Sequence, residues 1–242
     1  MSNFMETQGK AIDTHLPSME LKLGKNTFRI VGSILRRYGY WVKTPGGKFV
    51  FFESLAFDRN LEKFTNVEQD VVPDYYPTKE YAGKEVKNTP TWAYVSTVID
   101  RADGKIKELH LKKTYFESIL KIARSKNPAT KQIFGDPTDV NNGWDIVLEK
   151  EKTGPSVMNV KYTVDPFCAM STSALTEEEL LLIEEAPDIF DRHPRPTRED
   201  QIKLMESILN GEYDAKFAKK DEDKPSAGNE GTDREAVSEL SQ

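Results

Sequence analysis

The sequence contains one cysteine, Cys168, so it can form no intramolecular disulfide, which is the pattern of a protein from a reducing compartment. It has no apolar run near the roughly 20 residues that a membrane-spanning helix requires. The segment MSNFMETQGK at its start lacks the charged-then-apolar pattern of a secretory signal peptide. These absences predict a soluble, cytoplasmic protein with no membrane association.

Catalytic and cofactor motifs are also absent. The sequence has no P-loop and no GxSxG, HExxH or GxGxxG pattern. Its histidines, His15, His110 and His193, have no cysteine or carboxylate at metal-ligand spacing, and one cysteine cannot complete a zinc finger. We therefore expect a protein that is not an enzyme and has no catalytic residues, no cofactor and no metal. A nucleic-acid enzyme such as a nuclease is the third hypothesis, weakened by the lack of a metal-binding carboxylate motif.

Charge is distributed unevenly along the chain. Residues 21–131 carry 21 Lys and Arg against 12 Asp and Glu, whereas residues 132–242 carry 12 against 25. The whole-chain net charge of −6 therefore hides a basic, aromatic-rich front and an acidic back. A basic surface attracts a polyanion, and an acidic segment of the same chain can compete for that surface. The alternative interpretation is that these charges serve solubility.

Hydrophobic alternation predicts a β-rich domain over residues 21–166. Turns at 44–47, 100–104 and 152–155 join its strands into hairpins, and Thr114 with Glu117 predicts a capping box that opens one inserted helix. We expect an α+β protein, mainly β, with an OB-fold-like small barrel; an SH3-like barrel or a small sandwich is the alternative. The predicted strands are 28–35, 40–42, 49–52, 91–99, 105–111, 144–149 and 157–164.

The segments around this domain have a different character. Residues 1–20 are polar and unpatterned and predict a flexible N-terminal arm. Residues 167–217 predict a helical acidic extension, with helices that begin after Thr176 and Thr197. Residues 218–242 contain no aromatic residue and many charges, which predicts a disordered acidic tail.

Basic and aromatic residues are interleaved in the front half of the chain. Binding of a single nucleic-acid strand requires cations that follow the phosphates and flat rings on which unpaired bases stack. Trp92 and Tyr94 share one face of strand 91–99, and the opposite face is itself a good core face, so these two rings are the best stacking candidates. The alternative for each ring is burial in the core. The predicted DNA-binding residues are Arg29, Arg36, Arg37, Tyr38, Tyr40, Trp41, Lys43, Lys48, Trp92, Tyr94, Lys105, Lys107, Lys112, Lys113 and Tyr115.

Three stretches carry a family resemblance: NTFRIV with the hairpin 40–52, TPTWAYVSTVIDRADGKIKELHLKKTYFESILKIA, and GWDIVLEKEKTG with VKYTV. In these stretches the chain resembles the single-stranded DNA-binding proteins of T-even-type bacteriophages, the gene 32 protein family. The resemblance implies an OB-fold that coats and protects single-stranded DNA, without sequence preference, during phage replication, recombination and repair in the host cytoplasm. It also implies that the acidic C-terminus recruits phage replication and recombination proteins. The DNA contacts that it implies are Arg36, Arg37, Trp41, Trp92, Tyr94, Lys105, Lys107, Lys112, Lys113 and Tyr115.

The chain departs from this family in its metal site. The family holds zinc with one histidine and three cysteines after its first hairpin, and residues 53–90 contain neither residue type. We expect the packing of Phe57, Phe64, Tyr75 and Tyr76 to hold this region instead.

The N-terminus is a second departure. The family binds cooperatively through a basic N-terminal motif, whereas Lys10 is the one basic residue among residues 1–20. Self-association along DNA is therefore left open. The alternative function is a non-catalytic protein-interaction or scaffold module with no nucleic-acid role.

Overall fold

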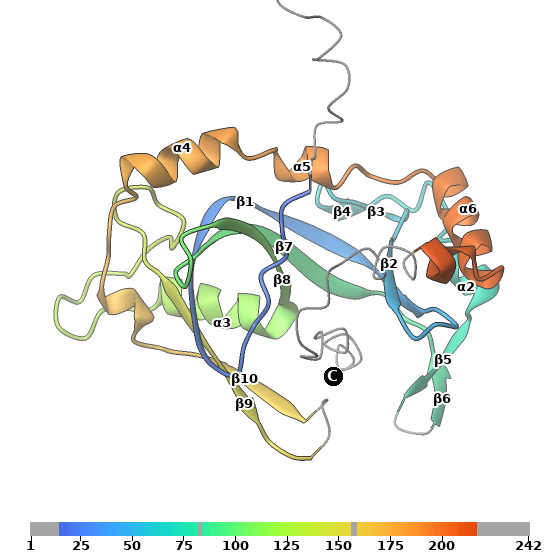
Figure 1. Ribbon diagram of the computed structural model, residues 1–242, viewed down its shortest axis with the longest axis horizontal. Coiled ribbons are helices and arrows are strands. Elements are labelled where there is room, and N and C mark those ends of the chain that lie inside the picture. The colour runs from blue at the N-terminus through green and yellow to red at the C-terminus, as the bar shows by residue number, and fades with distance from the viewer. Residues whose placement is uncertain (1–14, 82–83, 156–158, 217–242) are drawn as a thin grey trace, which may run out of the picture.

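The computed structural model describes residues 15–81, 84–155 and 159–216. Its centre is a six-stranded antiparallel sheet in which the strand order is β10-β9-β1-β7-β8 and β2 also pairs with β1 (Figure 1). The strands are β1 (Gly24–Lys43), β2 (Phe49–Glu53), β7 (Thr91–Asp100), β8 (Ile106–Lys112), β9 (Ile146–Lys152) and β10 (Val160–Val164). The predicted hairpins β1–β2, β7–β8 and β9–β10 are all present.

The long strand β1 organises the sheet. Its beginning pairs with β9, its middle with β7 and its end with β2. The register with β7 shifts between Val31 and Ile34, where Gly32 has a φ of 67°. Such a bulge bends a strand and increases its twist, and glycine adopts this backbone conformation without strain. The bend lets one strand serve three neighbours and curves the sheet around α3 (Lys113–Arg124) (Figure 1).

The sheet is not closed into a barrel. Its end strands β8 and β10 do not pair with each other within the described ranges. The helix α3 contacts β7, β8 and β10, so it bridges the two ends of the sheet instead. The predicted α+β class is confirmed, whereas the predicted OB-fold-like small barrel is not, because the sheet stays open. The predicted capping box at Thr114 is also wrong, because the N-cap of α3 is Lys112, two residues earlier, and it makes no side-chain cap hydrogen bond.

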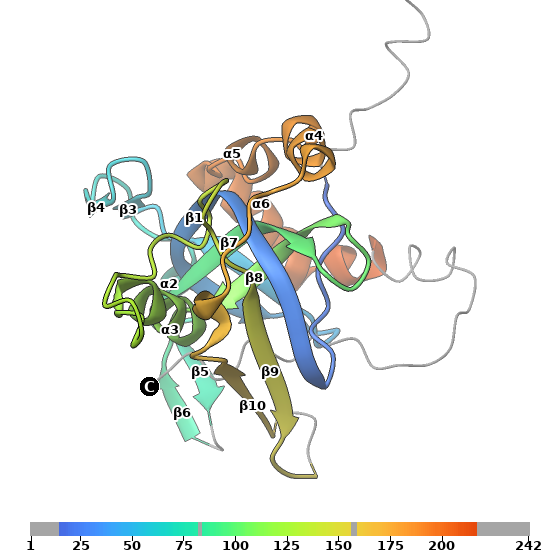
Figure 2. The same ribbon diagram turned by 90° about the vertical axis from the view of Figure 1, so that its left-hand side faces the viewer.

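Both faces of the sheet are covered. On one face, Ile119 and Ile122 of α3 pack in the largest apolar cluster with Phe28, Tyr94 and Trp144. The other face lies under the C-terminal helices α4 (Glu177–Glu185) and α5 (Ile189–Arg192) (Figures 1 and 2). The acidic extension therefore supplies the second layer that buries the sheet.

The C-terminal helices α4, α5 and α6 each pack apolar side chains against a different part of the sheet. Ile183 of α4 packs near Val31 and Ile99, and Ile189 of α5 packs with Leu35 and Val95. The helix α6 (Arg198–Leu209) packs against β1 and β2 at the far end of the sheet. The helix starts predicted after Thr176 and Thr197 are confirmed, and both have capping boxes. The division of the chain at residues 166 and 217 stays a prediction.

Residues 53–90 form two short hairpins and one helical turn. They are β3 (Phe57–Asp58) with β4 (Lys63–Phe64), α2 (Val72–Tyr75), and β5 (Thr78–Tyr81) with β6 (Lys84–Lys87). The Asp70 carboxylate ties this region to the sheet, because it accepts hydrogen bonds from the Tyr40 hydroxyl (2.9 Å), the Ser54 hydroxyl (3.0 Å) and the Leu55 amide (2.7 Å).

The aromatic packing predicted for this region is confirmed in part. Phe57 is buried and contacts Phe64, and Tyr76 packs against the cluster around Val72, but Tyr75 is exposed.

The N-terminal segment runs beside β8. The Met19 amide donates to the Glu108 carbonyl (2.8 Å), the Glu108 amide donates to the Pro17 carbonyl (2.9 Å), and Met19 is buried. For residues 15–20 the structure therefore corrects the predicted flexible arm, because these residues cover the open edge of the sheet. The rest of the arm and the predicted disordered tail lie outside the described residues. A short turn of 3-10 helix, η1 (Cys168–Met170), follows β10, and no described helix is long and apolar enough to cross a membrane.

Candidate nucleic-acid interface

A groove lies where β7, β8, α3 and β10 meet. Five predicted DNA-binding residues line it: Trp41, Trp92, Tyr94, Lys112 and Tyr115. The fold brings them together because Ala93 of β7 is paired with Lys112 of β8, and α3 begins directly after Lys112. The other lining residues are Leu21, Ala93, His110, Leu111 and Tyr162.

One wall of the groove combines rings with cations. The half-buried rings of Tyr115 and Tyr162 lie 5.1 Å apart, centroid to centroid. The Lys112 Nζ lies 6.0 Å from the Tyr115 ring and 5.8 Å from the Tyr162 ring, and the Lys150 Nζ lies 5.8 Å from Tyr162. Lys150 is buried and its Nζ donates to the Leu21 carbonyl (2.9 Å), so it holds this wall in place. Lys112 lines the groove, and its ammonium group beside the rings combines a stacking surface with a cation, the two elements of single-strand recognition.

The sequence interpretation missed Tyr162. It lies on β10, far along the chain from Tyr115, and the two rings meet because α3 packs against β10. The local signal was the alternation in VKYTV after a lysine-rich strand, which places Tyr162 on the face opposite Lys161 and Thr163.

Trp92 lies near the groove, but its ring is engaged. The Arg36 guanidinium carbon is 4.0 Å from the ring centroid, and the rings of Tyr38 and Phe57 lie 4.6 and 5.0 Å away. A cation over one ring face and aromatic edges around it leave little room for a base to stack. The Arg36 side chain is 39% exposed, so its guanidinium is the accessible group here.

The second predicted stacking residue, Tyr94, is buried. It is 6% exposed, and its ring is stacked on Phe116 at 4.1 Å. Burial raises the pKa of its phenol. The expected exposure of Tyr94 is wrong because the face it shares with Trp92 belongs to the main core, while the opposite face is covered by α4 and α5.

Two further predicted residues are buried. Arg29 is fully buried, and its Nη2 donates to the carbonyls of Asp139 (2.8 Å) and Ser173 (3.0 Å). Burial lowers the pKa of the Arg29 guanidinium and raises the pKa of the Tyr40 phenol. These side chains fix loops and strands, and neither offers a surface to a ligand.

The remaining predicted cations lie outside the groove lining. Arg37 pairs with Glu53 (3.3 Å) and lies over the Phe51 ring, and burial lowers the pKa of Arg37. Lys107 is held by Asp100 and Asp103, near the exposed Lys105 in the β7–β8 turn.

Three predicted lysines complete the set. Lys113 pairs with Glu117 (3.6 Å). The exposed Lys43 and the half-buried Lys48 flank the β1–β2 turn. The structure therefore places Lys112 in the groove, Lys113 at the start of α3, and Lys43, Lys48, Lys105 and Lys107 at or near two turns.

His110 is a groove residue that the sequence interpretation left without a role. It follows Glu108 by two residues on β8, so their side chains lie on one face of the strand and meet at 2.9 Å. Within the described ranges, no group of three or more His, Cys, Asp or Glu side chains is arranged to hold a metal ion.

Comparisons with known proteins give one informative relative. No family model matches the chain. A protein of Escherichia phage T5 named "Probable ssDNA-binding protein" is 26% identical over 263 aligned positions, which cover 97% of each chain. The similarity therefore includes the N-terminal segment and the C-terminal helices as well as the sheet. It supports a relation to this phage protein but gives no support for membership of the gene 32 protein family. The resemblance of the chain to that family stays a proposal.

Proposed function

We propose that this protein binds single-stranded DNA, without catalysis, along the groove between β7, β8, α3 and β10. The observation that carries the proposal is the wall of Tyr115 and Tyr162 with the Lys112 ammonium group beside both rings. Bases of a single strand stack on the rings, and a phosphate pairs with the Lys112 ammonium group. The name of the phage T5 relative supports the same ligand.

The finer parts of the proposal concern how the DNA is used. Ring stacking accepts any base, so binding is independent of sequence and suits a protein that coats DNA during phage replication, recombination and repair. The helix between β8 and β9 and the curved antiparallel sheet support an open variant of the OB arrangement. The resemblance to the gene 32 protein family points the same way.

The acidic C-terminal segment regulates this binding and recruits partner proteins in our proposal. Asp214, which follows α6, accepts hydrogen bonds from the Thr44 hydroxyl and the Gly46 amide, both 2.7 Å, in the β1–β2 turn. A carboxylate that occupies a hydroxyl and a backbone amide beside Lys43 and Lys48 takes positions that suit a phosphate oxygen. The acidic residues beyond it compete with DNA for the same basic surface.

A direct test measures the anisotropy of a fluorescent oligo(dT) with increasing protein over a range of salt concentrations. If about 4 to 6 phosphates are neutralised, the logarithm of the affinity falls with the logarithm of salt with a slope of about −3 to −4. A slope near zero, or tighter binding to a duplex of equal length, would contradict the proposal.

A protein-interaction module is the second candidate function. The β3–β4 hairpin, which projects from the body in Figure 2, carries the exposed apolar residues Leu61 and Phe64, and Val67 follows it. Exposed apolar patches of this kind are typical of protein contacts. A protein that fails to bind oligo(dT) at low salt but binds a partner through this hairpin would favour this function.

A further inference from the structure

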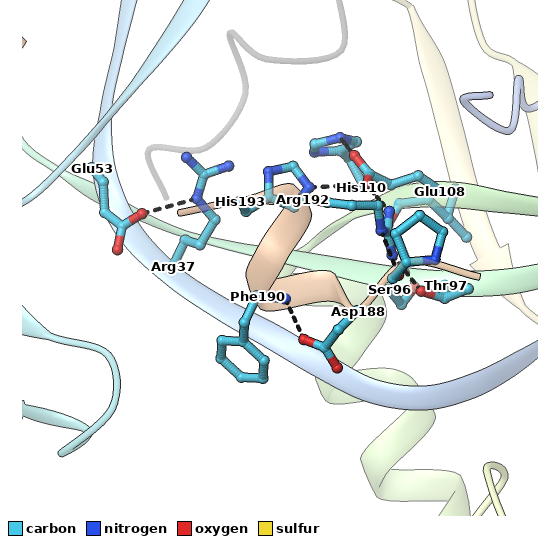
Figure 3. A network of polar contacts seen from close by, with 12 residues as sticks. Arg37, Glu53, Ser96, Thr97, Glu108, His110, Asp188, Phe190, Arg192 and His193 are labelled. Atoms are coloured by element: carbon cyan, nitrogen blue, oxygen red, sulfur yellow. Dashed lines mark hydrogen bonds and ion pairs between the residues drawn. The ribbon is translucent and has the colours of Figure 1, made fainter. Parts of the chain in front are cut away.

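Glu108 is the centre of a polar network at the border of the groove. Its carboxylate contacts His193 Nε2 and His110 Nε2, each at 2.9 Å, and the guanidinium of Arg192 (Figure 3). Arg192 also donates to the Thr97 hydroxyl. Burial alone would raise the pKa of Glu108, but the hydrogen bonds from the two histidines lower it well below its usual range. The carboxylate is therefore ionised at neutral pH.

The contact with Glu108 determines which nitrogen of His110 is basic. An ionised carboxylate can only accept, so Nε2 of His110 carries its proton and donates it to Glu108. The other nitrogen, Nδ1, is then the one that can gain a proton and become a donor. The His110 side chain is 50% exposed and lines the groove, whereas His193 is 19% exposed and belongs to the C-cap of α5.

The surrounding charges leave a proton on His110 uncompensated in the absence of a ligand. The charge of Glu108 is already matched by Arg192, so the network has no net charge when both histidines are neutral. Lys112, two residues along β8, lines the same groove and adds a further cation there.

Neighbouring elements add charges of both signs at this border, and Arg37 is itself paired with Glu53 (3.3 Å). Arg37 of β1 lies within electrostatic reach of Glu108, and the charge of Glu108 raises the pKa of Arg37 in opposition to burial. The N-terminal segment meets Glu108 through the backbone, and its titratable side chains are His15 and Glu20.

We propose that His110 is a proton-dependent contact for a DNA phosphate, so that the protein takes up a proton when single-stranded DNA enters the groove. The inference rests on the single-stranded DNA binding proposed above. A phosphate beside Nδ1 supplies the negative charge that the network lacks, and the Glu108 carboxylate orients the ring from the other side. Binding is therefore expected to tighten as the pH falls across the range in which histidine side chains change charge.

The experiment measures oligo(dT) affinity at constant salt between pH 8.0 and pH 5.5 for the full chain and for His110→Gln. Glutamine keeps a donor for Glu108 but does not titrate. Uptake of one proton limits the effect to about tenfold per pH unit, and we expect about three- to tenfold tighter binding over the whole range for the wild type. In His110→Gln this pH-dependent gain is lost, so the affinities at pH 5.5 and pH 8.0 become nearly equal.

Two control variants separate this proposal from general electrostatics. His193→Gln changes the other imidazole on Glu108 and is expected to keep the pH dependence. Lys112→Gln removes a cation that does not titrate in this range, so it weakens binding by the same factor at every pH. A pH dependence that His110→Gln leaves intact, or that His193→Gln abolishes instead, would overturn the proposal.

A second measurement needs no variant. In an NMR titration of the wild-type histidine rings, one imidazole is expected to titrate at higher pH with oligo(dT) bound than without it. If oligo(dT) binds but leaves the histidine titrations unchanged, the role proposed for His110 is overturned and the proposed DNA binding is not. Absence of oligo(dT) binding at every pH overturns the proposed function as well, so the two failures are distinguishable.

Discussion

Two aromatic clusters near the groove differ in what surrounds their rings. The first, Tyr38, Phe57, Phe64 and Trp92, consists of rings in contact with one another, with centroids 4.6 to 6.4 Å apart. The second consists of Tyr115 and Tyr162, and lysine ammonium groups lie at both rings. The first cluster is centred on the buried Phe57 and holds the β3–β4 hairpin on the sheet, and the Arg36 guanidinium lies over its Trp92 ring. The second cluster is half-buried and lines the groove beside Lys112. We therefore expect the first cluster to serve stability and, under the proposed function, the second to bind DNA.

The largest effect is expected from breaking the first cluster. Phe57 is 1% exposed, and Phe57→Ala should lower the free energy of unfolding by about 3–5 kcal/mol, because it removes a buried ring and leaves a cavity. Urea denaturation followed by circular dichroism measures this. Tyr162→Ala is the matched control, since its ring is half-buried and its loss should cost clearly less. Equal losses for the two variants would show that the clusters do not differ in this way.

Changes in the second cluster should affect DNA binding more than stability. Tyr115→Ala and Tyr162→Ala should each weaken oligo(dT) binding by about 1–3 kcal/mol, or roughly 5- to 150-fold, if one base stacks on each ring. Tyr115→Phe and Tyr162→Phe keep the rings and should bind nearly as tightly as the wild type. If the alanine variants bind with unchanged affinity in an anisotropy titration, the rings have no part in recognition.

The sequence allowed the hairpins of the sheet to be predicted, because alternation and turn residues are local signals. It did not reveal which face of β7 is accessible. Trp92 and Tyr94 do alternate with a core-like face, but that face is buried by α4 and α5, which follow much later in the chain. Long-range contacts decided the outcome, and α3 with the main cluster buried Tyr94 on the other side.

The candidate site shows the same limit. Lys112 and Tyr115 were predictable because a basic strand runs directly into a helix. Tyr162 was not, because its contact with Tyr115 joins β10 to α3. Arg29 looked like a DNA contact among other cations, yet it is bound to the carbonyl of Asp139, 110 residues away in sequence.

A smaller effect is expected when a lysine in the groove is replaced, and the effect of replacing a lysine in a turn should be smaller still. Lys112→Gln should reduce the steepness of the salt dependence by about 0.7, the contribution of one phosphate contact on a single strand. Lys105→Gln is the control, because Lys105 lies in the β7–β8 turn at the other end of β8. Anisotropy titrations at several salt concentrations compare the two. A loss for Lys105→Gln as large as that for Lys112→Gln would mean that the DNA path extends along the whole strand.

The smallest effect is expected from the acidic C-terminus. Deletion of residues 218–242 should tighten oligo(dT) binding slightly at 50 mM salt and leave it unchanged at high salt, because salt screens the tethered charges. Asp214→Asn should add to this effect by freeing Thr44 and Gly46 of the β1–β2 turn. Binding that neither change tightens at low salt would make the acidic segment a solubility device.

Tryptophan fluorescence tests the central claim most directly. Of the three tryptophans, Trp144 is buried in the core, and Trp41 and Trp92 line the groove beside the tyrosine wall. Titration with oligo(dT) should quench the fluorescence to a saturating, salt-sensitive limit, and duplex DNA should quench it weakly. In the double variant Tyr115→Ala/Tyr162→Ala the quenching midpoint should move to at least about 25-fold higher oligo(dT) concentration, from two lost stacking contacts. A wild-type signal that oligo(dT) leaves unchanged, or an identical midpoint in the double variant, would contradict single-strand binding in this groove.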